Sequence, residues 1–366
     1  MLQSLTHRAR RILITTDAVG GVWRYSLDLA RALAAHGDSI VLAGLGPQPS
    51  AEQAQEAQSF ATLAWLESPP DWMTRDESDL GRLPGELQAL AEAYAIDVAH
   101  LNAPAQAAGL DLPSPVIAVS HSCVVTWLQA VRAQRPSGEW AWQLDRNRAG
   151  FDRADAVIAP SRSHADMLET CYGAIAGLSV VYNCALPRPG AASREPFVFA
   201  AARWWDEGKN AGLLDAAAAL CQWPFQAAGP LAGPDGQRVH FDNCVSLGSI
   251  SHASVRRLMT RAGIFVSTSI YEPFGLAALE AALSGTPLVL ADIATYREIW
   301  DGAAAFFDAR DPYALAACIE SLSHDESLRH RLGQRAALQA RKFSPAAQVA
   351  AMCEVYDRAA MAVAER

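Results

Sequence analysis

The fold class of this chain is decided by a strand-like run, Gly263-Ile264-Phe265-Val266-Ser267, and by the segment that follows it, Tyr271-Glu272-Pro273-Phe274-Gly275-Leu276-Ala277-Ala278-Leu279-Glu280. Pro273 disfavours helix at Glu272, while Gly275 permits a tight turn. A helix should therefore begin between Phe274 and Leu276. A strand, a turn and a helix in succession are typical of an α/β fold with parallel sheets.

Glu280 lies on the edge of the buried face of this expected helix. At 100° per residue, Leu276, Leu279 and Leu283 cluster on one side, and Glu280 is only about 40° from Leu276. An unpaired charge at that position is costly. The start of the helix offers free N–H groups that suit a phosphate, and a carboxylate one turn behind it suits ribose hydroxyls. The segment therefore leads to the hypothesis of a nucleotide-sugar site.

Length and composition indicate a globular protein of two domains. A chain of 366 residues exceeds one small core, and domains of about 150–200 residues are the natural division. Hydrophobic residues make up 51% and charged residues 19%, which is ordinary globular composition. The net charge is −9 and no run of Lys or Arg is long, so we expect no nucleic-acid binding.

The cysteines and the N-terminus indicate a cytoplasmic protein. Seven cysteines without CxxC spacing favour neither a disulfide framework nor a zinc site. The apolar run Ile12-Leu13-Ile14 is too short for a signal-peptide core, and no window reaches 18 apolar residues. We expect no transmembrane segment, leave peripheral contact with the inner face of the membrane open, and make no prediction of the oligomeric state.

Short β-rich runs alternate with helical stretches, which favours two doubly wound domains. The predicted strands are Arg11–Thr15, Ser39–Ala43, Val98–Leu101, Val116–Ser120 and Ala156–Ala159, then Phe197–Ala201, Phe225–Ala228, Ile264–Ser267 and Pro287–Leu290. Predicted helices include Trp23–His36, Leu83–Tyr94 and a final pattern over Pro345–Glu365. The Pro-, Gly- and Ala-rich stretch Ala185–Ser193 reads as a linker. We therefore expect domains at 1–186 and 194–345, followed by a helix at 346–366.

Residues just after strands should line the cleft between the domains, because ligands bind beyond the carboxyl ends of parallel strands. Gly20 and Gly21 follow the first strand, where they permit a ligand to approach the backbone at a helix start, although a plain βα turn explains them too. His121 follows a strand and could bond a sugar hydroxyl, although a bond to nearby backbone is the alternative. For His100, which also ends a strand, we favour a structural role.

Arg203 and Lys209 lie at the two ends of one predicted strand-to-helix loop. Two such cations can converge on a diphosphate, with Arg as a fork and Lys as a point charge. They would stabilise negative charge on a leaving diphosphate without a metal. The alternative is an exposed pair neutralised by Asp206 and Glu207.

Three tryptophans, Trp127, Trp140 and Trp142, lie in a polar stretch. Their rings could stack on sugars or line an acceptor site, but packing of a helix against the core is equally consistent. We leave them outside the predicted site.

The chain resembles the GT-B glycosyltransferases of the GT4 type, the glycogen-synthase-like retaining enzymes. The resemblance spans nearly the full length and is carried by these pieces in matching order: Gly20-Gly21, Ala154 to Ser161, Val181-Tyr182-Asn183, Arg203 to Asn210, and Ser269 to Ala291. It implies two Rossmann-like domains that face a cleft, with the final helix packing back on the N-terminal domain.

The resemblance also implies an activity and residue roles. Such enzymes transfer a sugar from a nucleoside-diphosphate sugar, here a UDP- or GDP-sugar, to a hydroxyl of a glycan, glycolipid or small molecule, with retention and without a metal or cofactor. By motif position, the residues that meet the donor are Gly20, Gly21, His121, Arg203, Lys209, Glu272, Phe274, Gly275, Leu276 and Glu280. Among these, Glu280 would bind the ribose, and His121, Glu272, Arg203 and Lys209 would act nearest the chemistry.

Departures from the family pattern leave the donor open. Ala202 stands where a Gly usually precedes the Arg, Trp204-Trp205 replace a smaller residue, and Asn210 stands where Gly often follows the Lys. The alternatives are a nucleotide-sugar 2-epimerase of the same fold and a catalytically silent nucleotide-sugar-binding protein. A nicotinamide oxidoreductase is disfavoured because no GxGxxG follows the first strand.

Overall fold

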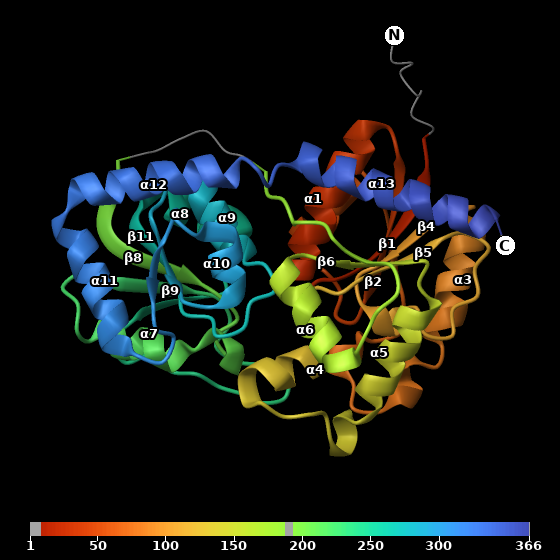
Figure 1. Ribbon diagram of the computed structural model, residues 1–366, viewed down its shortest axis with the longest axis horizontal. Helices are drawn as coiled ribbons and strands as arrows, with labels where there is room; N and C mark the ends of the chain where they lie inside the picture. Colours follow the sequence, from red (N-terminus) through yellow and green to blue (C-terminus); the bar gives the residue numbers. More distant parts are fainter. Residues whose placement is uncertain (1–8, 187–192, 366) are drawn as a thin grey trace, which may run out of the picture.

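The computed structural model describes residues 9–186 and 193–365 and contains two parallel β-sheets, each in its own lobe (Figure 1). Most of the expected linker, residues 187–192, lies outside the described residues, as do residues 1–8 and 366. Both sheets are parallel and flanked by helices, which confirms the predicted doubly wound α/β class.

The first sheet has the strand order β3-β2-β1-β4-β5-β6-β7. Its strands are β1 (Arg11–Asp17), β2 (Ser39–Leu45), β3 (Thr62–Trp65), β4 (Val98–Leu101), β5 (Val116–Val119), β6 (Ala156–Ala159) and β7 (Leu178–Val180). The helices around it are α1 (Gly21–His36), α2 (Ala51–Gln58), α3 (Leu83–Ala93), α4 (Val124–Trp127), α5 (Trp142–Arg153) and α6 (Arg162–Tyr172).

The second sheet has the order β10-β9-β8-β11-β12-β13. Its strands are β8 (Glu195–Ala201), β9 (Phe225–Ala228), β10 (Val245–Gly248), β11 (Ala262–Ser267), β12 (Leu288–Ala291) and β13 (Ala305–Phe307). Its helices are α7 (Ala211–Ala218), α8 (His252–Arg261), α9 (Leu276–Leu283), α10 (Ala294–Trp300), α11 (Pro312–His324) and α12 (Glu326–Ala340), and α13 (Pro345–Ala364) follows.

The central strands contain apolar runs because both of their faces are covered. In β1, Ile12 and Ile14 join the core beneath α1, whereas Leu13 joins a second core beneath α3. A strand buried on both faces has a continuous apolar run rather than alternation. This burial explains why the sequence revealed these strands.

Helix α13 crosses from the second lobe back onto the first, as expected (Figure 1). Its residues Met352 and Tyr356 are buried in the same core as Ile12. The Tyr356 hydroxyl also hydrogen-bonds the Nδ1 atom of His100 at 2.8 Å, and Tyr25 bonds its Nε2 at 3.2 Å. His100 is therefore a buried structural residue that joins α1, β4 and α13.

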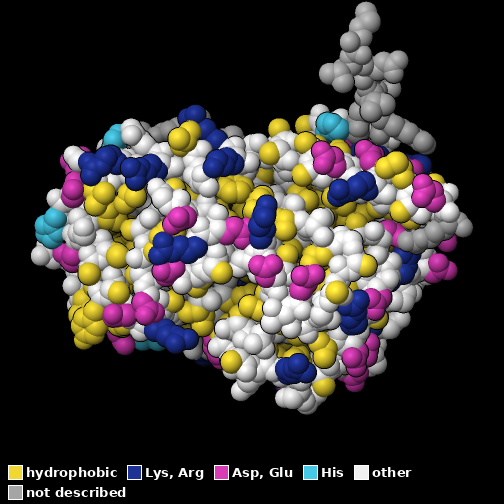
Figure 2. Space-filling view, viewed as in Figure 1, with side chains coloured by type: hydrophobic (Ala, Val, Ile, Leu, Met, Phe, Trp, Pro, Cys, Tyr) yellow, Lys and Arg dark blue, Asp and Glu magenta, His cyan; other side chains and the backbone are white. Residues whose placement is uncertain are grey.

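The strand order reverses once in each sheet, between β1 and β4 and between β8 and β11. Ligands of doubly wound sheets bind beyond the strand ends at such reversals. On the face shown in Figure 2, Lys and Arg side chains are interspersed with Asp and Glu rather than gathered in one patch. None of the helices in the described ranges has the length and apolar character needed to cross a bilayer.

Candidate active site

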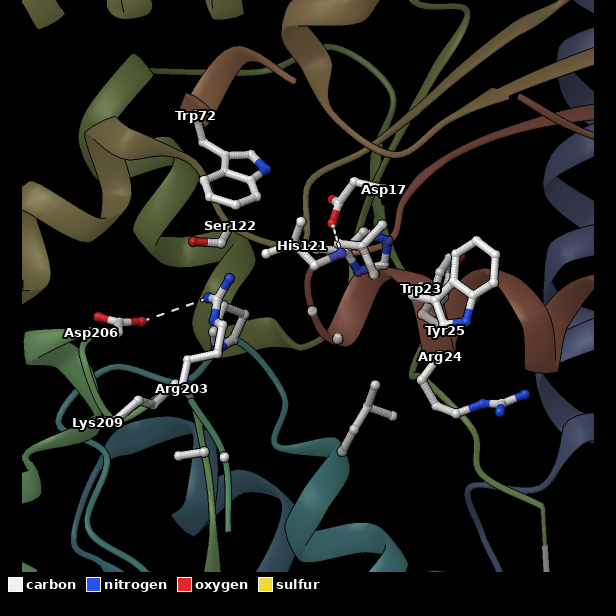
Figure 3. A pocket seen from close by; sticks show the side chains of 18 of the residues that line it. Asp17, Trp23, Arg24, Tyr25, Trp72, His121, Ser122, Arg203, Asp206 and Lys209 are labelled. Carbon is white, nitrogen blue, oxygen red and sulfur yellow. Dashed lines mark hydrogen bonds and ion pairs between the residues drawn. The ribbon is translucent and has the colours of Figure 1, made fainter. Parts of the chain in front are cut away.

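A cleft of about 1220 Å³ lies between the lobes and is lined by the loops that follow β1, β5, β8, β9 and β11 (Figure 3). All the predicted site residues except Glu280 line it: Gly20, Gly21, His121, Arg203, Lys209, Glu272, Phe274, Gly275 and Leu276. The structure therefore brings residues from both lobes into one cavity.

Arg203 reaches across the cleft from the loop after β8. A Cβ placed on Gly20 would lie 3.2 Å from the Nη1 atom of Arg203, so the absence of a side chain at Gly20 permits a close approach of the two lobes. Its guanidinium carbon lies 5.4 Å from the ring centre of Trp205 and 6.0 Å from that of Trp72. Its Nη2 atom is 3.6 Å from the Asp206 carboxylate. Aromatic rings and one carboxylate thus surround the guanidinium without covering it.

Lys209 and Glu272 form a direct ion pair, with 2.7 Å between Nζ and Oε2. Both side chains are largely buried, at 14% and 19% exposure. Thr268 holds the Lys209 backbone, since its hydroxyl donates to the Lys209 carbonyl at 2.7 Å. The two loops that follow β8 and β11 are therefore joined at the residues with the opposite charges.

Gly275 sets the start of α9. Its φ is 93°, and a Cβ there would lie 2.7 Å from Cε1 of Tyr296. Only glycine adopts this backbone without strain, and it leaves the first N–H groups of α9 without a side-chain cap. The helix begins at Leu276, within the predicted range, and its N-terminus opens into the cleft.

Glu280 lies behind the cleft wall, with 7% exposure. Its Oε1 atom is 2.6 Å from Nε2 of His252, and His252 itself lines the cleft. The costly unpaired charge anticipated from the sequence is thus avoided by an imidazole partner. His252, at the first position of α8, is a site residue that the sequence reading missed, because an isolated His at a helix start carries no motif.

His121 follows β5, and its Nε2 atom is 3.0 Å from Oδ1 of Asn102. The Asn102 amide donates to the Thr15 carbonyl at 2.5 Å, so its Oδ1 is an acceptor and Nε2 carries the proton. Burial, together with the nearby His100 and His164, lowers the pKa of His121 to about 3. The ring is therefore neutral at physiological pH, with its lone pair on Nδ1.

Asp17 and Trp72 are cleft residues that the sequence analysis did not identify. Asp17 ends β1 and accepts a hydrogen bond from the Val19 backbone at 2.9 Å. Burial raises the pKa of Asp17, while Val19, Arg203 and a hydrogen bond from the Trp72 side chain oppose the rise. Trp72 belongs to the segment 47–82, which has many Pro, Ser and acidic residues and no clear periodicity. Its ring centre lies 6.0 Å from the guanidinium carbon of Arg203, and Figure 3 shows the ring projecting into the pocket.

Two of the three noted tryptophans, Trp127 and Trp140, line the cleft. The Trp127 indole N–H donates to Oδ1 of Asp206 at 2.8 Å, and the same oxygen accepts from the Gly208 backbone at 2.9 Å. Trp142 points elsewhere and donates to the Arg75 carbonyl at 3.0 Å. Trp127 therefore joins the first lobe to the loop that carries Arg203 and Lys209.

The segment after His121 makes further contacts with the second lobe. Arg132 binds both carboxylate oxygens of Glu207, at 3.0 and 2.6 Å. The Tyr271 hydroxyl, next to Glu272, lies 2.8 Å from Oγ1 of Thr126. One segment of the first lobe thus touches both loops that carry the charged site residues.

Among the described residues, the group of His, Cys and acidic side chains that could hold a metal ion is His36, Asp38 and Cys353. None of the three lines the cleft. The Glu272 carboxylate within the cleft is instead neutralised by Lys209.

Comparison with known proteins identifies the family. The family model described as Glycosyltransferase Family 4 matches residues 19–185, and that described as Glycosyl transferases group 1 matches residues 240–339. The glycogen synthase of Mycobacterium tuberculosis is 26% identical over 371 residues, which cover 87% of this chain and 86% of the relative. D-inositol 3-phosphate glycosyltransferase of Corynebacterium glutamicum is 35% identical over 100 residues, or 27% of this chain and 24% of the relative.

Solved structures share the fold. Sucrose-phosphate synthase from Thermosynechococcus elongatus superposes with a TM-score of 0.77 at 19% identity, over 95% of this chain and 98% of that chain. Anabaena HepE in complex with UDP-glucose gives 0.72 at 17% identity, over 95% and 99%. The chain belongs to the GT4-type glycosyltransferases with the GT-B fold, and it is a transferase.

Proposed function

We propose that the protein transfers a sugar from a UDP- or GDP-sugar to an acceptor hydroxyl, with retention of the anomeric configuration and without a metal. The observation that carries this proposal is the convergence of Arg203, Lys209 and the uncapped start of α9 on one cleft. Anabaena HepE, which has the same fold, is described in complex with UDP-glucose. A sugar nucleotide is the ligand that suits both observations.

The diphosphate would lie between the lobes. Arg203 can bind it as a fork, Lys209 as a point charge, and the N–H groups at the start of α9 as a helix-terminal anion site. Gly20 and Gly21 leave the opposite wall open to the backbone. As the bond to the sugar breaks, negative charge grows on the diphosphate, and the fixed cations stabilise it there. This is why a metal is not required in the proposal.

Glu272 would bind hydroxyls of the transferred sugar while its ion pair with Lys209 fixes the carboxylate. The ribose would meet the Glu280–His252 pair, with His252 at the surface of the cleft. Both carboxylates are thus ligands rather than general bases.

His121 would accept a hydrogen bond from the donor sugar through its Nδ1 lone pair. The neutral ring, oriented by Asn102, positions the sugar and takes no proton. The acceptor attacks from the face that the diphosphate leaves, and a phosphate oxygen receives the acceptor proton. Retention follows from this front-side geometry.

The first test is thermal stabilisation by a panel of UDP-, GDP- and ADP-sugars. A ligand that binds only the native state raises its stability by about 2.7 kcal/mol at 100 times its Kd. Lys209→Ala and Glu280→Gln should abolish or weaken that stabilisation and reduce transfer at least tenfold. Unchanged stabilisation and transfer in both variants would exclude this donor site.

Three further measurements test retention, metal independence and the 2-epimerase alternative separately. The product anomer, assigned by NMR, should match the donor anomer, and an inverted product contradicts retention. Activity should survive EDTA, whereas a strict need for a divalent ion contradicts the metal-free mechanism. Donor incubated alone should not yield an isomerised sugar nucleotide; if it does, the 2-epimerase alternative replaces ours.

A further inference from the structure

The cleft extends well beyond the residues assigned to the donor. Its volume of about 1220 Å³ exceeds the roughly 300–1,000 Å³ of a site for one drug-sized ligand. Its lining also includes Asp17 at the end of β1 and Asp71 and Trp72 in the 3₁₀ turn Asp71–Met73, none of which is assigned to the donor. A second ligand therefore has room beside the donor.

An indole forms one wall of this second part. Trp72 is partly exposed and lines the cleft together with Asp17, and its side chain lowers the pKa of that carboxyl. Its ring centre lies 6.0 Å from the guanidinium carbon of Arg203, and therefore near the expected position of the leaving diphosphate. Indole faces bind the C–H faces of sugar rings, while lipid chains require a continuous apolar surface.

Two carboxylates complete the same wall. Asp17 and Asp71 are 8% and 5% exposed, and both line the cleft. Burial raises the pKa of Asp71 to about 6, and the charge of Asp17 contributes in the same direction. Carboxylates accept hydrogen bonds from hydroxyls, and they repel phosphates.

No cation in the described part of this wall is free to neutralise a phosphorylated acceptor. Arg75 is exposed, and it pairs with Glu139 at 3.3 Å and with Asp235 at 3.5 Å. Arg146, whose charge acts on Asp71, donates to the Ala105 carbonyl and pairs with Glu77. Arg203 is assigned to the donor.

We propose that the acceptor is an uncharged sugar unit that packs against Trp72 and gives hydroxyl hydrogen bonds to Asp17 and Asp71. This inference rests on the proposed transferase function and names its acceptor class. It distinguishes the chain from a relative such as D-inositol 3-phosphate glycosyltransferase, whose name specifies a phosphorylated acceptor.

A panel of acceptors tests whether the acceptor is an uncharged sugar. With the donor found by thermal stabilisation, release of the nucleoside diphosphate is measured with methyl glycosides, disaccharides, the corresponding sugar phosphates and inositol phosphate. Neutral sugars should be used at least tenfold more efficiently than their phosphates. A preference for phosphates, or for a lipid acceptor over all soluble sugars, overturns the inference. Donor binding that persists in that case leaves the transferase proposal standing, whereas loss of donor binding refutes the transferase proposal itself.

Substitutions of Trp72 and Asp71 test whether these side chains bind the acceptor. Trp72→Leu should raise the acceptor KM at least tenfold and leave the donor KM within twofold. Trp72→Phe, which keeps an aromatic ring, should have an acceptor KM much closer to that of the wild type. Asp71→Asn should narrow the preference for neutral over phosphorylated acceptors. Trp142→Leu is the matched control, because its indole lies outside the cleft. Equal acceptor KM values for Trp72→Leu and wild type, in protein that the donor stabilises normally, contradict the assignment.

Discussion

Replacing Trp127 by Phe tests whether the first lobe positions the cations of the donor loop. The substitution keeps an aromatic ring beside Arg132, whose guanidinium carbon lies 5.0 Å from the ring centre of Trp127. It removes the indole N–H that donates to Asp206 at 2.8 Å. Asp206 then keeps its bond from the Gly208 backbone and its neighbour Arg203.

The size of the effect follows from the burial of Asp206, which is 8% exposed. A hydrogen bond to a charged group contributes about 1.5–3 kcal/mol. A tenfold change in rate corresponds to about 1.4 kcal/mol, so kcat/KM should fall roughly 10- to 150-fold if the contact is made in the reactive state and broken when the lobes separate. The reason is that an Asp206 with one donor fewer attracts Arg203 more strongly and withdraws it from the diphosphate.

The assay is steady-state transfer with a double-mutant cycle. Trp127→Phe, Asp206→Asn and the double variant are compared, with Trp142→Phe as the control for loss of an indole N–H elsewhere. The two single effects should be strongly non-additive, because both variants remove the same bond. Additive effects, or a Trp127→Phe enzyme with wild-type kcat/KM, would refute the positioning role.

Three other perturbations give separate checks. Gly275→Ala should destabilise the fold by about 1–3 kcal/mol, because its φ is positive and the new Cβ would contact Tyr296, and it should weaken stabilisation by the donor. Gly212→Ala is the control, because its Cβ meets nothing within 4 Å. Equal melting temperatures of the Gly275→Ala and Gly212→Ala variants contradict the prediction. His252→Gln should raise the donor KM severalfold with little change in kcat, and an unchanged donor KM removes His252 from the ribose site. Burial lowers the pKa of His100 and of His164 to about 4, below the unfolded value of about 6.5. The stability that these neutral rings provide is therefore complete above pH 6.5 and is lost as the pH falls towards 4, by up to about 1.4 kcal/mol per pH unit for each ring. Asp71, with a raised pKa, partly opposes this loss, and a melting temperature that stays constant from pH 6.5 to 4.5 contradicts the prediction.

The strands that the sequence predicted are those with two covered faces. The four that it missed are β3, β7, β10 and β13, and each is the outermost strand of its sheet. Outer strands pair on one side only, and β3, β7 and β10 have no fully buried residue. They therefore lack the continuous apolar run by which the central strands are recognised.

The residues proposed to bind the donor could be selected from the sequence because they are concentrated in two loops of fixed spacing. Arg203 and Lys209 flank one loop, and Glu272 and Gly275 lie within a single segment. The direct pairing of Lys209 with Glu272 was not predictable, because it depends on how the loops after β8 and β11 approach each other. Spacing along the chain carries no information about that approach.

The residues of the proposed acceptor wall were missed for a different reason. Asp17 is one more residue of an expected strand-to-helix connection, and Trp72 lies in a stretch that folds into short 3₁₀ turns without periodicity. Neither belongs to a motif. They become neighbours only because the irregular segment folds over the carboxyl ends of the first sheet, next to β1.

The contacts across the cleft make the two halves of the site interdependent. Thr126, Trp127 and Arg132 follow His121 within one short segment, and they hold the loops that carry Glu272, Lys209 and Arg203. If the lobes separate, these bonds break together, and Asp206 remains free to pair with Arg203. We therefore expect the cations to reach their reactive arrangement only when the lobe proposed to bind the acceptor is in place. Such a dependence would restrict cleavage of the donor to the closed enzyme, in which water has least access to the sugar.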